Sequence, residues 1–179
     1  DILYLEGYII NNLALVETAC SIAHSKNMLV ALDLASYNVV EEHKDPFLKI
    51  VSGYVDILFA NEQEALAFTG LDGEKALPSL SEMSPTVILK IGAEGSWLKT
   101  ADETIKISAY PVKCVDTTGA GDLYAAGFLY GYANGLPLEK CGILGSFMAG
   151  KVIEIIGARM DRERFALIKK EISLILGTR

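Results

Sequence analysis

Short apolar runs alternate with longer segments of helical periodicity along most of the chain. The pattern predicts strands at 2–5, 28–34, 56–60, 86–91, 96–100, 105–108 and 112–115. It predicts helices at 12–25, 46–53, 61–69, 120–134, 137–156 and 161–176, and a further short helix before residue 86. Because strands that alternate with helices usually pair in parallel, the expected fold is α/β with a mainly parallel sheet. No repeat or linker divides it, so a single domain is expected.

The composition narrows the class of ligand. With 51% apolar residues among 179, the chain can bury a sizeable core. A formal net charge of −7 argues against binding to nucleic acid or to an anionic membrane surface. No apolar run reaches the length of a membrane span, and the first residues do not resemble an export signal. Cys20, Cys114 and Cys141 lie far apart, as expected for reduced thiols of a cytoplasmic protein.

The run Asp-Thr-Thr-Gly-Ala-Gly-Asp at 116–122 combines two carboxylates, two hydroxyls and a flexible turn directly before a long apolar helix. Gly119 and Gly121 allow the backbone to come close to a ligand, and the helix start offers unpaired N–H groups to an anion. Asp122 lies just inside that helix, where its carboxylate can accept a proton from a hydroxyl beside the anion. A helix cap alone would require one such polar group rather than four. The run therefore predicts a phosphate site with its own base.

Two further groups of polar residues follow predicted strands. Asn61 and Glu64 come after the strand at 56–60, at the end where open α/β sheets bind ligands. Being three residues apart in a first helical turn, they face the same way, which also suits an ordinary helix cap. The turn at 90–95, Lys-Ile-Gly-Ala-Glu-Gly, is either a structural hairpin or a ligand-contacting turn.

The run at 116–122 resembles, at every position, the second signature of the pfkB, or ribokinase-like, family of carbohydrate kinases. The segments Leu-Tyr-Ala-Ala-Gly-Phe at 123–128 and Ile-Gly-Ala-Arg at 156–159 are most similar to the adenosine-kinase-like branch. The resemblance covers all 179 residues but only the second half of the family's length, and the chain contains no Gly-Gly pair. We therefore expect residues 1–179 to be the C-terminal portion of a single three-layer α/β/α ribokinase-like kinase domain, with the N-terminal part and lid missing.

The resemblance implies roles for individual residues. Asp122 is the implied catalytic base, and the amides of Gly119, Ala120 and Gly121 the implied anion hole. The residues implied to contact ATP are Lys90, Gly92, Gly95 and Gly121. Asn61 and Glu64 are implied to hold Mg²⁺, Glu64 through water. A monovalent cation such as K⁺ would be bound by Asp116, the Thr118 carbonyl, and carbonyls near Val152 and Gly157.

The implied function is transfer of the γ-phosphoryl group of ATP to a hydroxyl of a small molecule, either an adenosine-like nucleoside or a sugar. Ala35 stands where many sugar kinases of the family carry the Asn of an Asp-x-Asn pattern that begins here at Asp33, and this weakens the sugar alternative. The resemblance also implies a homodimer formed through the missing lid. Two hypotheses of other classes remain: a non-catalytic nucleotide-binding or partner-binding module derived from a truncated kinase, and a flavodoxin-like sensor of a phosphorylated ligand. The missing first half predicts that the chain alone is inactive.

Overall fold

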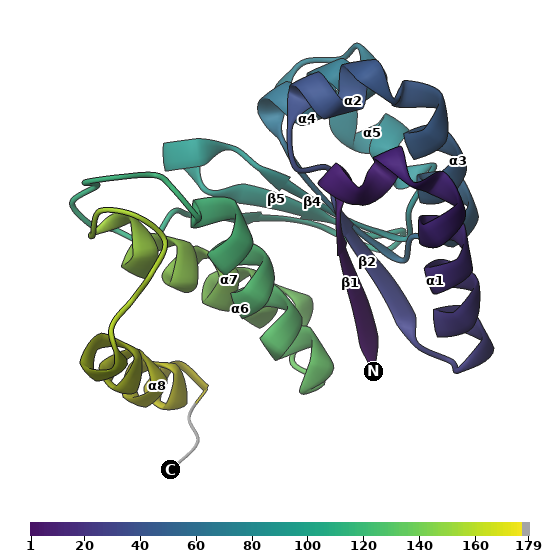
Figure 1. Cartoon of the computed structure of the whole chain (residues 1–179). Coiled ribbons are helices and arrows are strands. Elements are labelled where there is room, and N and C mark those ends of the chain that lie inside the picture. Colours follow the sequence, from purple (N-terminus) through teal and green to yellow (C-terminus); the bar gives the residue numbers. More distant parts are fainter. Residues whose placement is uncertain (177–179) are drawn as a thin grey trace. The chain divides into compact units, whose positions relative to one another are not determined.

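The computed structural model of the chain describes residues 1–176, which form two compact units (Figure 1). The first unit extends from Asp1 to Lys106 and contains most of the sheet, and the second begins at Ile107 and is helical. Every helix in the described part of the chain falls short of the length and hydrophobicity that a membrane crossing requires.

The sheet has six strands in the order β1 to β6, so each strand lies beside its neighbours in the sequence. The strands are β1 (Ile2–Glu6), β2 (Leu29–Asp33), β3 (Ile57–Asn61), β4 (Thr86–Lys90), β5 (Ser96–Lys99) and β6 (Thr104–Ile107). Strands β1 to β4 are parallel, and β5 is antiparallel to β4. The predicted α/β class with a mainly parallel sheet is confirmed.

Helices connect the parallel strands of the first unit. They are α1 (Leu13–Ser25), α2 (Tyr37–Glu42), α3 (Lys44–Tyr54), α4 (Glu62–Thr69) and α5 (Ala76–Ser81), with 3₁₀ turns at Gly7–Asn11, Gly73–Lys75 and Gly92–Glu94. The sequence pattern missed α2, because six residues are too few to display a helical period. The Asn12 side chain accepts a hydrogen bond from the Leu15 amide at 3.2 Å, which fixes the start of α1.

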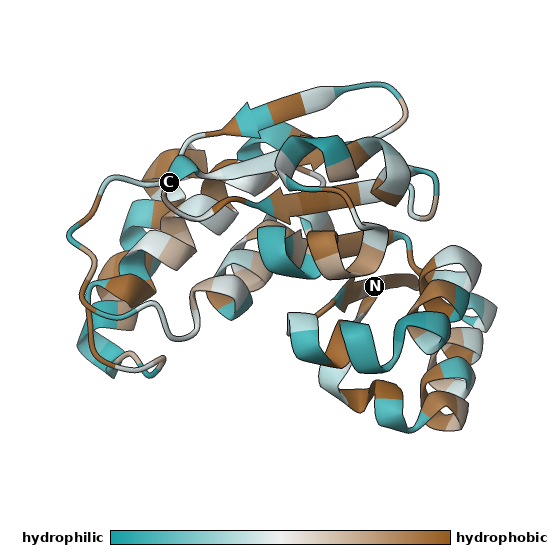
Figure 2. Cartoon of the chain, turned by 90° about the horizontal axis from the view of Figure 1, so that it is seen from above, coloured by the Kyte–Doolittle hydropathy of each residue, from teal (hydrophilic) through white to brown (hydrophobic). Residues whose placement is uncertain are grey.

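Alternate residues of the parallel strands face opposite sides of the sheet. Val30, Leu32 and Leu58 pack with apolar side chains of α1 to α5 in one continuous core. Residues of the other face, such as Phe59 and Ile88, are also completely buried, which is why these strands read as continuous apolar runs. The helices, in contrast, carry both hydrophobic and hydrophilic residues (Figure 2).

The second unit is built from α6 (Ala120–Ala133), α7 (Leu138–Ile153) and α8 (Arg162–Leu176). Glycines bring α6 and α7 into backbone contact: a Cβ atom at Gly127 would lie 2.5 Å from the Leu144 carbonyl oxygen. Arg164 ties α8 to the end of α7, because its guanidinium donates to the Lys151 carbonyl at 2.8 Å and to the Glu154 carboxylate at 2.6 Å.

One predicted strand, at 112–115, is wrong. The segment has no regular secondary structure, and Val115 is exposed. The amides of Val115 and Asp116 donate to the Ile153 carbonyl, at 2.7 and 3.2 Å. The end of α7 thus offers an acceptor to N–H groups that a strand would have directed to a neighbouring strand.

Candidate active site

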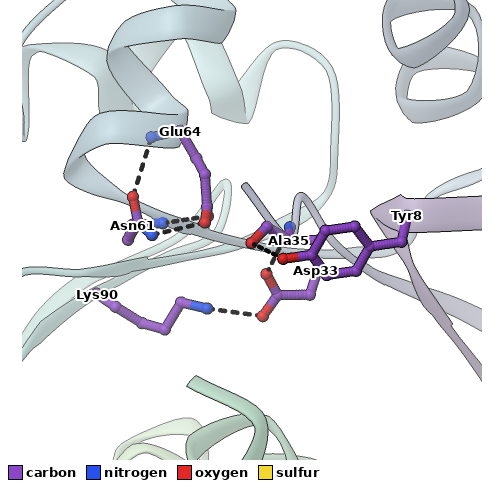
Figure 3. Close-up of polar contacts among 6 residues, drawn as sticks. All are labelled: Tyr8, Asp33, Ala35, Asn61, Glu64 and Lys90. Atoms are coloured by element: carbon purple, nitrogen blue, oxygen red, sulfur yellow. Dashed lines mark hydrogen bonds and ion pairs between the residues drawn. The ribbon is translucent and has the colours of Figure 1, made fainter. Parts of the chain in front are cut away.

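Three polar residues end three adjacent parallel strands: Asp33 ends β2, Asn61 ends β3 and Lys90 ends β4 (Figure 3). Asn61 pairs with Lys90 in the sheet, and Asp33 pairs with Phe59, two residues before Asn61. Because side chains alternate along a strand, this register places all three on the same face of the sheet. That face is the one opposite α1 to α5. The carboxyl ends of parallel strands are where open α/β sheets bind ligands.

Asn61 and Glu64 contact each other through three hydrogen bonds, as their spacing predicts. The Glu64 amide donates to the Asn61 side-chain oxygen at 2.9 Å, while the backbone and side-chain amides of Asn61 donate to the two Glu64 carboxylate oxygens at 2.8 and 2.6 Å. The pair is therefore a capping box that fixes the first turn of α4. It also fixes the direction of the carboxylate of Glu64, a residue that is only 2% exposed.

Burial raises the pKa of Glu64 above the usual value for a glutamate. The Lys90 charge and the Asn61 amide act against this shift, while the Asp33 charge adds to it. A bound cation would stabilise the ionised form of a buried carboxylate such as this one. Within residues 1–176, no three His, Cys, Asp or Glu side chains are arranged to hold a metal ion. Mg²⁺ usually takes one or two protein carboxylates and keeps several waters, so Glu64 and Asn61 fit this ion.

Lys90 forms an ion pair with Asp33 that the sequence pattern did not reveal. The Lys90 Nζ atom lies 2.6 Å from Asp33 Oδ2, and the two side chains are 13% and 8% exposed. The sequence feature that could have indicated this ion pair is an acid near the end of one predicted strand and a lysine near the end of another. Only the order and register of the strands bring the two together.

The turn after Asp33 has an uncommon backbone. Ala35 has a φ of 68°, in the left-handed region that favours Gly, Asn and Asp. Its amide donates to Asp33 Oδ1 at 3.1 Å, and its carbonyl accepts a hydrogen bond from the Tyr8 hydroxyl at 3.4 Å. The carboxylate of Asp33 is thus bonded at both oxygens.

The predicted nucleotide turn follows β4. Gly92 and Gly95 have φ values of 56° and 100°, and the Ile91 amide closes the turn by donating to the Gly95 carbonyl at 2.9 Å. A Cβ atom at Gly92 would meet no other atom within 4 Å, so the backbone angle rather than crowding requires glycine there. That this turn contacts ATP stays a prediction.

The predicted anion turn lies in the second unit, at the start of α6. Gly119 has a φ of 79°, and a Cβ atom there would lie 2.6 Å from the Cβ atom of Ala158. The Ala120 amide donates to the Thr117 carbonyl at 3.1 Å. The amides of Gly119 and Gly121 have no acceptor among the described residues, so they remain free for a ligand.

Asp122 lies in the first turn of α6 and is exposed. Its carboxylate makes no hydrogen bond or ion pair with any residue of the described range 1–176. An unpartnered carboxylate beside free amides is suited to accept a proton from a bound hydroxyl.

Asp116 fastens the anion turn to the segment after α7. One of its oxygens accepts hydrogen bonds from the amide and hydroxyl of Thr118, at 2.9 and 2.8 Å, and the other accepts one from the Gly157 amide at 2.8 Å. Two residues predicted to belong to a monovalent cation site, Asp116 and Thr118, therefore contact each other. Whether a cation binds them stays a prediction.

The hydrogen bonds from Gly157 and Thr118 lower the pKa of Asp116 below 3.8, the value of an unperturbed aspartate. A depressed pKa means that the carboxylate stabilises the fold above the unfolded pKa, and that this stabilisation is lost as the pH falls through the folded value. We expect a ¹³C NMR titration of the Asp116 carboxyl to give a midpoint below 3.8. The variant Asp116→Asn identifies the signal by its disappearance. A midpoint at or above 3.8 would contradict the hydrogen bonding described.

Several known proteins that this chain resembles in sequence or in structure are named as kinases. The sequence profile of the pfkB family carbohydrate kinases matches residues 1–163. An uncharacterized sugar kinase of Archaeoglobus fulgidus is 43% identical over 104 residues, which cover 58% of this chain and 42% of that protein. A nucleoside kinase of Methanocaldococcus jannaschii is 34% identical over 136 residues, which cover 75% of this chain and 44% of that protein.

Among solved structures, the adenosine kinase from Sinorhizobium meliloti matches with a TM-score of 0.88 and 36% identity. The match covers 95% of this chain and 54% of that one. The chain thus spans about half the length of the relatives it matches.

Proposed function

The chain belongs to the pfkB family of carbohydrate kinases, and on that premise we propose that it carries the base and nucleotide-binding residues of an ATP-dependent kinase acting on a nucleoside or sugar hydroxyl. The family resemblance inferred from residues 116–122 is confirmed, and so is the ribokinase-like α/β fold. One observation carries the proposal furthest. Asp122, which has no partner among residues 1–176, lies beside the free amides of Gly119 and Gly121 at the start of a long helix.

In the proposed reaction, the second unit binds the phosphoryl group and removes the proton. The amides of Gly119 and Gly121 donate to phosphoryl oxygens, where negative charge accumulates in the transition state. The start of α6 adds the favourable field of its dipole. Asp122 accepts the proton of the acceptor hydroxyl as the oxygen attacks phosphorus. Asp116 keeps the turn in place through Thr118 and Gly157.

In the first unit, the proposed roles concern the metal and the nucleotide. Glu64 would hold Mg²⁺ through water, and Asn61 orients the Glu64 carboxylate. When bound, Mg²⁺ would neutralise charge on the phosphate oxygens. Lys90, with the turn that contains Gly92 and Gly95, would contact the nucleotide. K⁺ binding by Asp116 and Thr118, and a homodimer, stay predictions implied by the resemblance.

The acceptor we propose is a nucleoside. The nucleoside kinase and adenosine kinase among the similar proteins support this choice. Ala35, which lacks a polar side chain, supports it against a simple sugar. The test is to assay the full-length protein with ATP and a panel of nucleosides and sugars. Turnover of a free sugar in preference to every nucleoside would contradict the choice.

We expect Glu64→Gln to raise the Mg²⁺ concentration needed for half-maximal activity about 10- to 100-fold, with a smaller effect on the KM of the acceptor. Glutamine has one acceptor oxygen, so it can accept only one of the two hydrogen bonds that Asn61 donates to the carboxylate. The bond from the residue 64 amide to the Asn61 side chain is kept, so α4 should still begin at the same residue. The raised pKa of Glu64 means that its charge opposes folding once the pH rises through the folded pKa, so loss of that charge offsets part of the cost of the lost hydrogen bond.

Glu62→Gln is the matched control, because Glu62 lies in the same helical turn but is exposed. Magnesium titrations of both variants, each followed by acceptor titrations, separate the two roles. An unchanged magnesium dependence together with a raised acceptor KM in Glu64→Gln would assign this residue to the acceptor instead.

A further inference from the structure

The ion pair between Lys90 and Asp33 crosses the end of β3 rather than joining two adjacent strands (Figure 3). Its atoms are 2.6 Å apart, and neither side chain is more than 13% exposed. Removing two charges from water costs free energy that their attraction often fails to recover. Stability of the fold is therefore a weak explanation for this pair, and its position at the ligand-binding edge of the sheet calls for another.

The two partners differ in mobility. Asp33 is held at both oxygens, one by Lys90 and the other by the Ala35 amide. Lys90 has a flexible chain of four methylene groups and an ammonium with three donors. If the pair opens, the ammonium moves while the carboxylate stays in place.

The charges around the pair favour such a movement when an anion arrives. Asp33 and Glu64 provide two carboxylates, while Lys90 is the cation whose charge acts on the pKa of Glu64. A phosphate that approaches this edge is attracted by Lys90 and repelled by the carboxylates. A phosphate oxygen also accepts the same kind of charge-assisted hydrogen bond from an ammonium as Asp33 Oδ2 does.

We propose that Asp33 is a positioning residue that holds the Lys90 ammonium in the nucleotide-free protein and competes with a nucleotide phosphate for it. The inference rests on the proposed function, in which Lys90 contacts the nucleotide. Asp33 then sets the affinity for phosphate-bearing ligands through Lys90, without touching the reacting atoms. Loss of its charge should tighten nucleotide binding, whereas loss of a carboxylate that only supports the fold would weaken it or leave it unchanged.

The test compares ADP with adenosine, which has no phosphate, by calorimetry without Mg²⁺. In Asp33→Asn we expect the Kd of ADP to fall about tenfold, because the lysine no longer leaves a charged partner, and the Kd of adenosine to stay the same. In Lys90→Met we expect weaker ADP binding. Adding Asp33→Asn to Lys90→Met should then give a smaller gain than Asp33→Asn alone, since only the repulsion between the Asp33 carboxylate and the phosphate is removed and no ammonium remains to be released.

Asp33→Asn leaves a buried ammonium without a charged partner, so its folding stability is expected to fall and to recover in the double variant. An independent measurement on the unmodified chain uses the ¹⁵N signal of Lys90 Nζ, which Lys90→Met identifies. ADP should shift that signal, and adenosine should not.

Equal or weaker ADP binding by Asp33→Asn, or an Nζ signal that ADP does not shift, overturns the inference and leaves the proposed function in place. If the unmodified chain binds neither ADP nor ATP, the proposed function fails and the inference fails with it.

Discussion

Asp122→Asn should lower the turnover rate about 10²- to 10⁴-fold, which is the usual contribution of a positioned general base. Asparagine has nearly the same shape, and the Asp122 carboxylate makes no hydrogen bond or ion pair within residues 1–176. The start of α6 loses only the interaction of a charge with the helix dipole, worth about 0.3–1 kcal/mol. ATP affinity should therefore change little. The measurements are kcat and the Kd of ATP, both made on the full-length protein.

The matched control is Glu139→Gln. Glu139 is also an exposed acid in the first turn of a helix of the second unit, but it lies outside the anion turn. It should leave kcat within a factor of about two, since surface substitutions of this kind rarely have larger effects. If Asp122→Asn turns over within a few-fold of the unmodified protein, Asp122 is not the base.

The second large effect concerns the 179 residues by themselves. The chain carries the anion turn, the Asn61–Glu64 pair and the turn after Lys90, and the family resemblance assigns the acceptor contacts to the half that it does not match. We expect it to bind ATP, with phosphorylation of a nucleoside below detection and at most slow hydrolysis of ATP. Holding the acceptor in line is worth about 7–11 kcal/mol of the barrier, and this term would be lost.

The measurement combines circular dichroism to verify folding, calorimetry for ATP, and a coupled assay for nucleoside phosphorylation. Asp122→Asn in the same chain serves as the control, because any trace of product from this site should disappear with the base. Robust phosphorylation by the 179 residues would mean that the acceptor site lies within them.

Local signals in the sequence were sufficient for most of the fold. The buried strand β3 contains the apolar run 57–60, and the helix beginning at Ala120 follows a run rich in glycine. The strand predicted at 112–115 is wrong, because a mixture of apolar and polar residues over only four positions does not distinguish a strand from an extended connection. The two cases differ only in the acceptor of the backbone amides, which here is the Ile153 carbonyl.

The candidate site was predictable where its residues are neighbours in the sequence. Asn61 and Glu64 are three residues apart, and residues 116–122 are contiguous, so spacing alone suggested their contacts. Lys90 and Asp33 are 57 residues apart in the sequence. Gly119, at the start of α6, lies close to Ala158, which follows α7. Such contacts depend on strand order and helix packing, which no short pattern encodes.

The left-handed backbone of Ala35 has a consequence for how this sequence can diverge. An alanine in this conformation carries a steric cost of about 1–2 kcal/mol, which Asn or Gly largely avoids. Replacement by Asn would therefore relieve strain while adding an amide next to the Asp33 turn. Most changes that alter specificity lower stability and need compensation elsewhere. At this position stability favours the gain of a polar group, so related sequences can exchange alanine for asparagine without passing through a poorly folded intermediate.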